Sequence, residues 1–230
     1  LDPTRLAERA ATIDRERATP SASLVESGAN GAGSRESEET THYSVIDRAG
    51  NAVSVTTTLN GAFGSKLVAA GTGVLLNNEM DDFTAEPGKP NLYGLVQGEA
   101  NAVAPGKRPL SSMTPTLLIA PDGSVRAVLG TPGGPTIITN VLQVLVNLLE
   151  FGLAPQAAVN APKIHHQHLP DRIDLEGDHP RDVVDALRRR GHEVRLRGGI
   201  GDFQLIVVDG ASQLRLGASD PRGAGAAVGH

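Results

Sequence analysis

The sequence predicts an α+β protein in which sheets and helices are stacked in layers. Several short segments alternate apolar and polar residues with a period of two, which is typical of strands with one buried face. These segments occur in runs with helical segments set between them, which argues against an alternating parallel βαβ fold. The 230 residues are enough to bury a core, and because aromatic residues make up only 3%, aliphatic side chains must fill it.

The composition excludes several classes of partner and site. The formal net charge is −5, whereas a nucleic-acid-binding surface needs clustered basic side chains, so we expect no nucleic-acid partner. Cysteine is absent, which excludes disulfides and thiolate metal ligands. No apolar run reaches the roughly 18 residues of a membrane-spanning helix, so we expect no membrane span in this chain. Because the first residue is Leu1 and not Met, a targeting segment upstream is compatible with the sequence.

The N-terminal part is predicted to form one helix and then a linker. Asp2 is a suitable N-cap and Pro3 a suitable first helical residue, with good helix formers as far as Arg17. Residues 20–39 are rich in Ser, Gly and Glu and have little to bury, which is typical of a flexible linker. The sequence therefore divides into an extension, 1–39, and a compact domain, 40–230.

The compact domain begins with a hairpin and continues into irregular chain. "THYSVIDRAGNAVSVTTTLN" (41–60) alternates on both sides of a turn, and "PTLLIAPDGSVRAVLGT" (115–131) does the same around residues 121–123. Residues 60–110 between them are rich in Gly, Asn, Pro and Asp. A long irregular region inside a compact domain is usually functional.

A helix and further strands complete the domain. Residues 135–152 are apolar around most of the helix circumference, which predicts a buried helix that starts at Pro135 and ends at Gly152. The remaining predicted elements are a short helix at 155–161, a strand at 172–176, a helix at 180–191 and strands at 193–197, 203–209 and 213–218.

Four short stretches carry candidate chemistry, and each has a plain structural alternative. Thr40 and Thr41 suit a strand, or one of them is a nucleophile at a junction that is cut. The glycines of "GTPGGP" (130–135) form a tight turn, or they let backbone N–H groups approach an anion. The serines of "PLSSMTPT" (109–116) and the carboxylates of "NNEMDDF" (77–83) are each common loop residues on their own.

The sequence has no convincing metal signature. "HHQH" (165–168) is its only histidine cluster, but neighbouring residues on a strand point to opposite faces, and no acidic partner stands at helical spacing. We interpret it as a structural polar corner. We expect neither a metal nor a cofactor.

Taken together, six blocks resemble one family. They occur in the order in which the small subunit of γ-glutamyltranspeptidases carries them: "TTHYSVID", "TTTLNGAFGS", "GVLLNNEMDDF", "PLSSMTPT", "GTPGG" and "GASDPR". The resemblance covers Thr40 to about Arg222, and residues 1–39 resemble the tail of the large subunit more loosely. It implies the four-layer αββα sandwich of N-terminal-nucleophile hydrolases and a precursor that cuts itself just before a threonine.

The resemblance implies a role for each matching residue. Thr40 matches the nucleophile, the bond between Glu39 and Thr40 is the implied cleavage site, and Thr58 matches the threonine that hydrogen-bonds the nucleophile. Cleavage places a free α-amino group, with a pKa near 8, beside the hydroxyl that it must deprotonate. The other matches are Asn60, Glu79 and Asp82 for the substrate ammonium, Ser111 and Ser112 for its carboxylate, Gly133 and Gly134 for the oxyanion hole, and Tyr93 for a mobile lid.

The implied function is γ-glutamyl transfer or hydrolysis, with glutathione and related compounds as donors and an amino-acid or peptide amine as acceptor. A related acylase acting on a β-lactam side chain or on polyglutamate is the alternative within the class, and a non-catalytic, unprocessed fragment is the alternative outside it. The family also uses an arginine from the large subunit, the implied partner, for which Lys107 and Arg108 are not assigned as substitutes. Family members commonly lie in the periplasm or outside the cell.

Overall fold

A computed structural model describes residues 2–24, 40–92 and 94–229. Its helices are α1 (Pro3–Ala11), α2 (Thr136–Leu149), α3 (Pro155–Asn160) and α4 (Arg181–Arg189), and single 3₁₀ turns occur at Ser21–Ser23, Glu79–Asp82 and Glu99–Asn101. Its strands are β1 (Thr41–Ile46), β2 (Ala52–Thr57), β3 (Thr116–Ile119), β4 (Val125–Gly130), β5 (Ile164–His165), β6 (Ile173–Glu176), β7 (Val194–Arg197), β8 (Gln204–Val208) and β9 (Arg215–Ser219).

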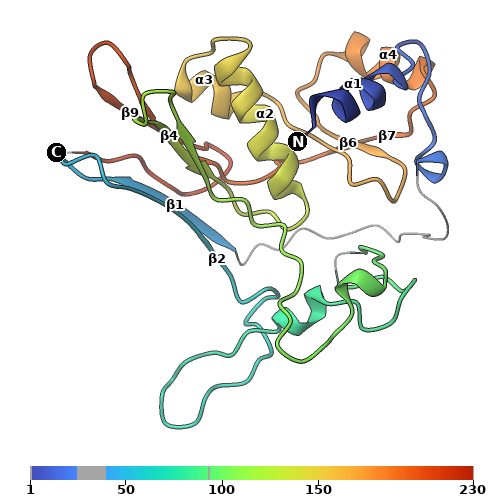
Figure 1. Ribbon diagram of the computed structural model, residues 1–230, viewed down its shortest axis with the longest axis horizontal. Helices are drawn as coiled ribbons and strands as arrows, with labels where there is room; N and C mark the ends of the chain where they lie inside the picture. The colour runs from blue at the N-terminus through green and yellow to red at the C-terminus, as the bar shows by residue number, and fades with distance from the viewer. Residues whose placement is uncertain (1, 25–39, 93, 230) are drawn as a thin grey trace.

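The elements stack as layers around one antiparallel sheet. This sheet has the strand order β3-β4-β8-β9, and helices α2 and α3 cover one of its faces (Figure 1). The β1–β2 hairpin lies against the other face, where it contacts β4 and β8. The prediction of a layered α+β fold is therefore confirmed: this chain forms a helical layer and two sheets of the predicted sandwich.

The core lies between α2 and the four-stranded sheet. Ile137 and Val144 on α2 meet Leu129 of β4 and Phe203 beside β8, and all four side chains are at most 1% exposed. Spacing of three and four residues places the buried side chains of α2 on one face. The opposite face carries exposed Leu142, so the helix that the sequence predicted to be buried is buried on one face only.

A smaller sheet, with the strand order β5-β6-β7, forms the second core. The pair β6–β7 is parallel and is joined through α4, so one local βαβ unit occurs within the layered fold. Ile173, Leu175 and Val184 pack together between this sheet and α4. The predicted polar corner at 165–168 begins at the last residue of β5. There, buried His165 contacts Thr139 of α2 through Nδ1 at 2.8 Å.

The N-terminal segment differs from its predicted form at two points. Helix α1 ends at Ala11, not near Arg17, because the Thr12 hydroxyl donates to the Arg9 carbonyl oxygen at 2.7 Å and Asp14 accepts the N–H of Glu16 at 2.8 Å. The predicted linker is anchored at Ser21, which is 2% exposed. Its N–H and hydroxyl donate to the Asp171 carboxylate at 2.8 and 2.9 Å. The remainder of that linker, 25–39, lies outside the described residues.

A buried ion-pair network joins the four-stranded sheet to the three-stranded sheet. Arg222 donates through Nε and Nη2 to the two Glu176 oxygens, both at 2.6 Å, and through Nη1 to Asp220 at 2.8 Å. Glu176 also accepts the backbone N–H groups of Lys163 and Ile200, both at 2.7 Å. Arg222, the last residue of the "GASDPR" block, therefore links the end of β9 to β6.

Removing the cation of this network is expected to destabilise the chain strongly. Arg222→Met leaves two buried carboxylates without their partner, and breaking such a pair costs about 3–5 kcal/mol. Urea unfolding measures the change. The control is Arg181→Met: Arg181 is 95% exposed and lies 3.9 Å from Asp185, so its loss should cost less than about 1 kcal/mol. Equal effects of the two substitutions would contradict the assigned role of Arg222.

Candidate active site

The site is built around two threonine hydroxyls on neighbouring strands. The antiparallel register pairs Thr41 with Thr57, which places Thr40 opposite Thr58 at the open end of the hairpin. Thr40 is 8% exposed, and its Oγ1 donates a hydrogen bond to Thr58 Oγ1 at 3.0 Å. Thr41 lies one residue further along and is exposed, because successive side chains on a strand face opposite sides. The structure thus distinguishes the two tandem threonines, which the sequence left as alternatives: Thr40 faces the site and Thr41 does not.

The turn after β2 holds Thr58 from its other side. The Asn60 N–H donates to Thr58 Oγ1 at 2.9 Å, and Asn60 adopts a left-handed φ of 72° that Asn tolerates better than most residues. Asn78 connects this turn to the acidic segment, since its carbonyl accepts Asn60 Nδ2 at 3.2 Å and its side chain accepts the Gly61 N–H at 2.8 Å. Asn78 was not singled out in the sequence, because an amide within an Asn pair gives no chemical signal by itself.

The acidic segment supplies one wall of the site. Glu79 and Asp82 lie on one 3₁₀ turn and both line the pocket. Burial raises the pKa of Asp82 to about 7, and the charge of Glu79, its hydrogen bond to Asp82 and the charge of Asp81 add to the effect. Two carboxylates in this arrangement form a site that favours a cation, which would relieve their repulsion.

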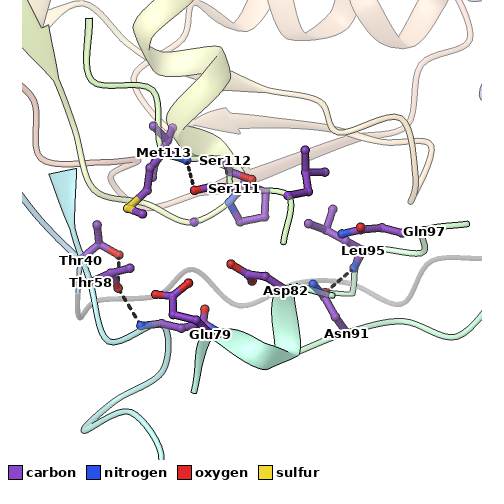
Figure 2. Close-up of a pocket in the computed structure, with 15 residues that line it drawn as sticks. Thr40, Thr58, Glu79, Asp82, Asn91, Leu95, Gln97, Ser111, Ser112 and Met113 are labelled. Carbon is purple, nitrogen blue, oxygen red and sulfur yellow. Dashed lines mark hydrogen bonds between the residues drawn. The ribbon is translucent and has the colours of Figure 1, made fainter. Parts of the chain in front are cut away.

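The opposite wall comes from the serine pair and the glycine loop. Figure 2 shows Ser111 and Ser112 across the pocket from Glu79 and Asp82. Gly134 lines the pocket at the start of α2, with a φ of 54°, and the preceding Gly133 has a φ of 136°. Both values lie in the region that favours glycine, so the turn requires these residues whether or not they bind an anion.

Most of the predicted residues therefore share one pocket. It brings together Thr40, Thr58, Asn60, Glu79, Asp82, Ser111, Ser112 and Gly134. Gly133 stands next to the lining without being part of it, and Glu39 and Tyr93 lie outside the described residues. The lining residues that the sequence analysis missed are Asn91, Leu95, Gln97, Leu110, Met113, Pro135 and Ile137. All seven have apolar or amide side chains, which belong to the site only because of where the fold places them.

Neither metal nor membrane features occur in the described part of the chain. Its His, Asp and Glu side chains form no group of three or more that could hold a metal ion. Among the described helices, none has the length and apolar character needed to cross a bilayer.

The high pKa of Asp82 should depend on Glu79. Glu79→Gln removes a neighbouring negative charge, so the pKa of Asp82 should fall toward its usual value and the ionised fraction at pH 6 should rise. Carbon-detected NMR of the Asp82 carboxyl group measures this titration. Asp81→Asn is the matched control and should lower the pKa less, because Asp81 contributes the smallest of these effects. A larger shift with Asp81→Asn would refute the assignment.

Comparisons with known proteins identify relatives of this chain. The sequence is 53% identical to the glutathione hydrolase proenzyme of Escherichia coli over 187 residues, covering 81% of this chain and 32% of the relative. The chain thus spans about a third of that relative's length.

Solved structures show the same fold. A γ-glutamyltranspeptidase chain from Pseudomonas nitroreducens matches with a TM-score of 0.76 and 47% identity, covering 83% of this chain and 99% of that one. A cephalosporin acylase from Bacillus halodurans matches with a TM-score of 0.76 and 28% identity, covering 96% of this chain and 37% of that one. The family model for gamma-glutamyltranspeptidase matches residues 1–230 in full. The chain therefore belongs to the γ-glutamyltranspeptidase family.

Proposed function

We propose that this chain carries the acyl-transfer centre of an enzyme that moves or hydrolyses γ-glutamyl groups through a threonyl acyl-enzyme on Thr40. The observation that carries the proposal is the buried Thr40 hydroxyl, hydrogen-bonded to Thr58 at 3.0 Å on the edge of a polar pocket. A hydroxyl needs a base and a fixed direction to act as a nucleophile. Thr58 supplies the direction, and the α-amino group that cleavage before Thr40 would release supplies the base.

The proposed reaction has two balanced steps. Thr40 Oγ1 attacks the γ-carbonyl carbon of the donor, the α-amino group takes the hydroxyl proton, and the amide C–N bond breaks as that proton passes to the leaving amine. Water or an acceptor amine then attacks the acyl carbon of the resulting ester, and the α-amino group takes a proton from it. The bond between Thr40 Oγ1 and the acyl carbon breaks as that proton passes to Thr40 Oγ1. Backbone N–H groups at Gly133 and Gly134 are assigned to the oxyanion in both steps, at the N-terminus of α2 where negative charge is favoured.

The two walls of the pocket fit the head group of an amino acid. An ammonium group offers three donors and a positive charge to Glu79 and Asp82, and its arrival would favour the ionised form of Asp82. Ser111 and Ser112 on the other wall offer hydroxyl donors to the α-carboxylate. This polar set supports a glutamyl donor over the side chain of a β-lactam, which carries no obligatory amino-acid head group.

The Escherichia coli relative is named a proenzyme, and this chain covers 32% of it. From the family resemblance we assign the large subunit of the same precursor to this chain as its partner and place it in the N-terminal portion. The outer face of the β1–β2 hairpin supports the assignment: Tyr43, Val45 and Val53 point away from the core and are 48–50% exposed. An apolar sheet face of this kind marks an interaction surface. A periplasmic or extracellular location is proposed from the family resemblance alone.

Replacing the nucleophile should abolish maturation and turnover together. In the full-length precursor, Thr40→Ala removes the hydroxyl that attacks both the Glu39 carbonyl and the donor. Mass spectrometry should find no fragment starting at Thr40, and a γ-glutamyl anilide should release no aniline. Thr40→Ser keeps the hydroxyl and should retain measurable cleavage. Thr41→Ala is the control: it changes a side chain on the opposite face of the strand and should leave cleavage intact. Cleavage before residue 40 in the Thr40→Ala protein would end the proposal.

A charge on the outer hairpin face should weaken assembly with the N-terminal portion. Val45→Asp places a carboxylate where we expect an apolar contact, and burying an unpaired charge there costs several kcal/mol. Size-exclusion chromatography of the cleaved protein should show separated portions. Arg48→Asp in the hairpin turn is the control and should leave the assembly intact. Intact assembly with Val45→Asp would show that this face is free in the whole protein.

A further inference from the structure

The hairpin that carries Thr40 meets the central sheet through polar side chains. Thr40, His42 and Ser44 alternate with exposed residues along the strand, so they share the inward face. From β2, the Ser54 hydroxyl donates to the Leu129 carbonyl of β4 at 3.0 Å. A sheet-on-sheet contact is usually apolar, so a polar contact next to the nucleophile calls for a specific explanation.

His42 is the largest side chain of this contact. It is 6% exposed, and both ring nitrogens have partners: Nδ1 lies 2.8 Å from Thr56 Oγ1 and Nε2 lies 3.2 Å from Ser44 Oγ. His42 and Thr56 face each other across the β1–β2 ladder. Thr40 and Thr58 are the next pair of residues on the inward face in the direction of the site. The His42–Thr56 pair and the Thr40–Thr58 pair therefore lie side by side on that face.

The ring also fills the space above the end of β4. A side-chain carbon at Gly130 would stand 2.5 Å from His42 Nδ1 and 2.8 Å from Nε2, closer than atoms of this kind approach. Gly130 is the last residue of β4, and Gly133 and Gly134 follow three and four residues later. His42 therefore touches the strand that leads directly into the glycine loop.

The imidazole is a neutral spacer and not a base for Thr40. Burial lowers the pKa of His42 to about 4, so the ring is uncharged at neutral pH. A neutral imidazole has one N–H donor and one acceptor nitrogen, and the two hydroxyls satisfy both. The Thr40 hydroxyl is instead directed at Thr58.

We propose that His42 is a positioning residue that sets the separation between the Thr40 hydroxyl and the Gly133–Gly134 loop by bridging Thr56 and Ser44 and packing on Gly130. This inference rests on the proposed acyl transfer at Thr40. Thr40 directly precedes β1 of the hairpin, whereas Gly133 and Gly134 follow β4 of the central sheet, and the His42 ring is a contact between these two sheets. Displacement of a reacting group by about 1 Å lowers a rate by about 10²-fold.

The test compares kcat per mature active site in the full-length, processed protein. His42→Phe keeps a ring but removes both hydrogen bonds, and should lower kcat for a γ-glutamyl anilide by about 10²-fold. KM should change little, because other residues hold the head group of the substrate. His42→Asn places an amide near Nδ1, preserves the shorter contact to Thr56 and should recover part of the rate. Mass spectrometry of the new N-terminus counts the mature sites, so poor folding or processing does not enter kcat.

If the His42→Phe protein does not mature, a second pair of variants tests the positioning role of His42. Thr56→Val removes the hydroxyl partner without changing the side-chain shape and should lower kcat about tenfold, whereas Thr56→Ser should restore it. Thr57→Val, on the outer face, is the matched control and should keep the wild-type rate. Wild-type kcat per mature site in His42→Phe, or in Thr56→Val, would overturn the positioning role. A wild-type protein that releases no aniline would instead overturn the proposed function, and the role of His42 would fall with it.

Discussion

The register of the β1–β2 hairpin is the constraint on which the rest of the site depends. Antiparallel pairing from Thr41↔Thr57 to Ile46↔Ala52 leaves Thr40 opposite Thr58, with both hydroxyls on the inward face. A slip of one residue would turn Thr40 outward and bring the exposed Thr41 to the site. The inward polar contacts of His42 and Ser54 oppose such a slip, because each would lose its partner.

Rigid and irregular parts of the chain contribute to the site differently. The sheet and the start of α2 place Thr40 and the glycine loop on well-buried elements, which suits the reacting roles that we propose for them, because such groups must be placed within a fraction of an ångström. The irregular segment and the residues that directly follow it supply the carboxylates and serines that line the pocket. It is connected to the rigid part through Asn78, whose hydrogen bonds with Asn60 and Gly61 hold the turn after β2 against the acidic turn.

Electrostatics within the pocket follow from this arrangement. Burial raises the pKa of the Asp82 carboxyl group, and the neighbouring charge of Glu79 adds to the effect. The ammonium of a bound amino acid would offset the repulsion between the two carboxylates. The pocket should therefore favour a cationic ligand. His42 shows the opposite use of burial, since loss of solvent keeps its ring neutral and keeps an uncompensated charge out of the sheet contact.

The sequence by itself determined the main helix, the described strands except β5, and eight of the fifteen residues that line the pocket. Alternation, turn residues and six family blocks are local properties, and they identified the hairpins at 41–60 and 115–131 and the residues from Thr40 to Gly134. Only the tertiary structure decided the anchoring of Ser21 by Asp171 and the contacts made by Asn78, His42 and Arg222. Each of these depends on a partner far away in the sequence, and hydrogen bonds or ion pairs between such partners exist only once the layers are stacked.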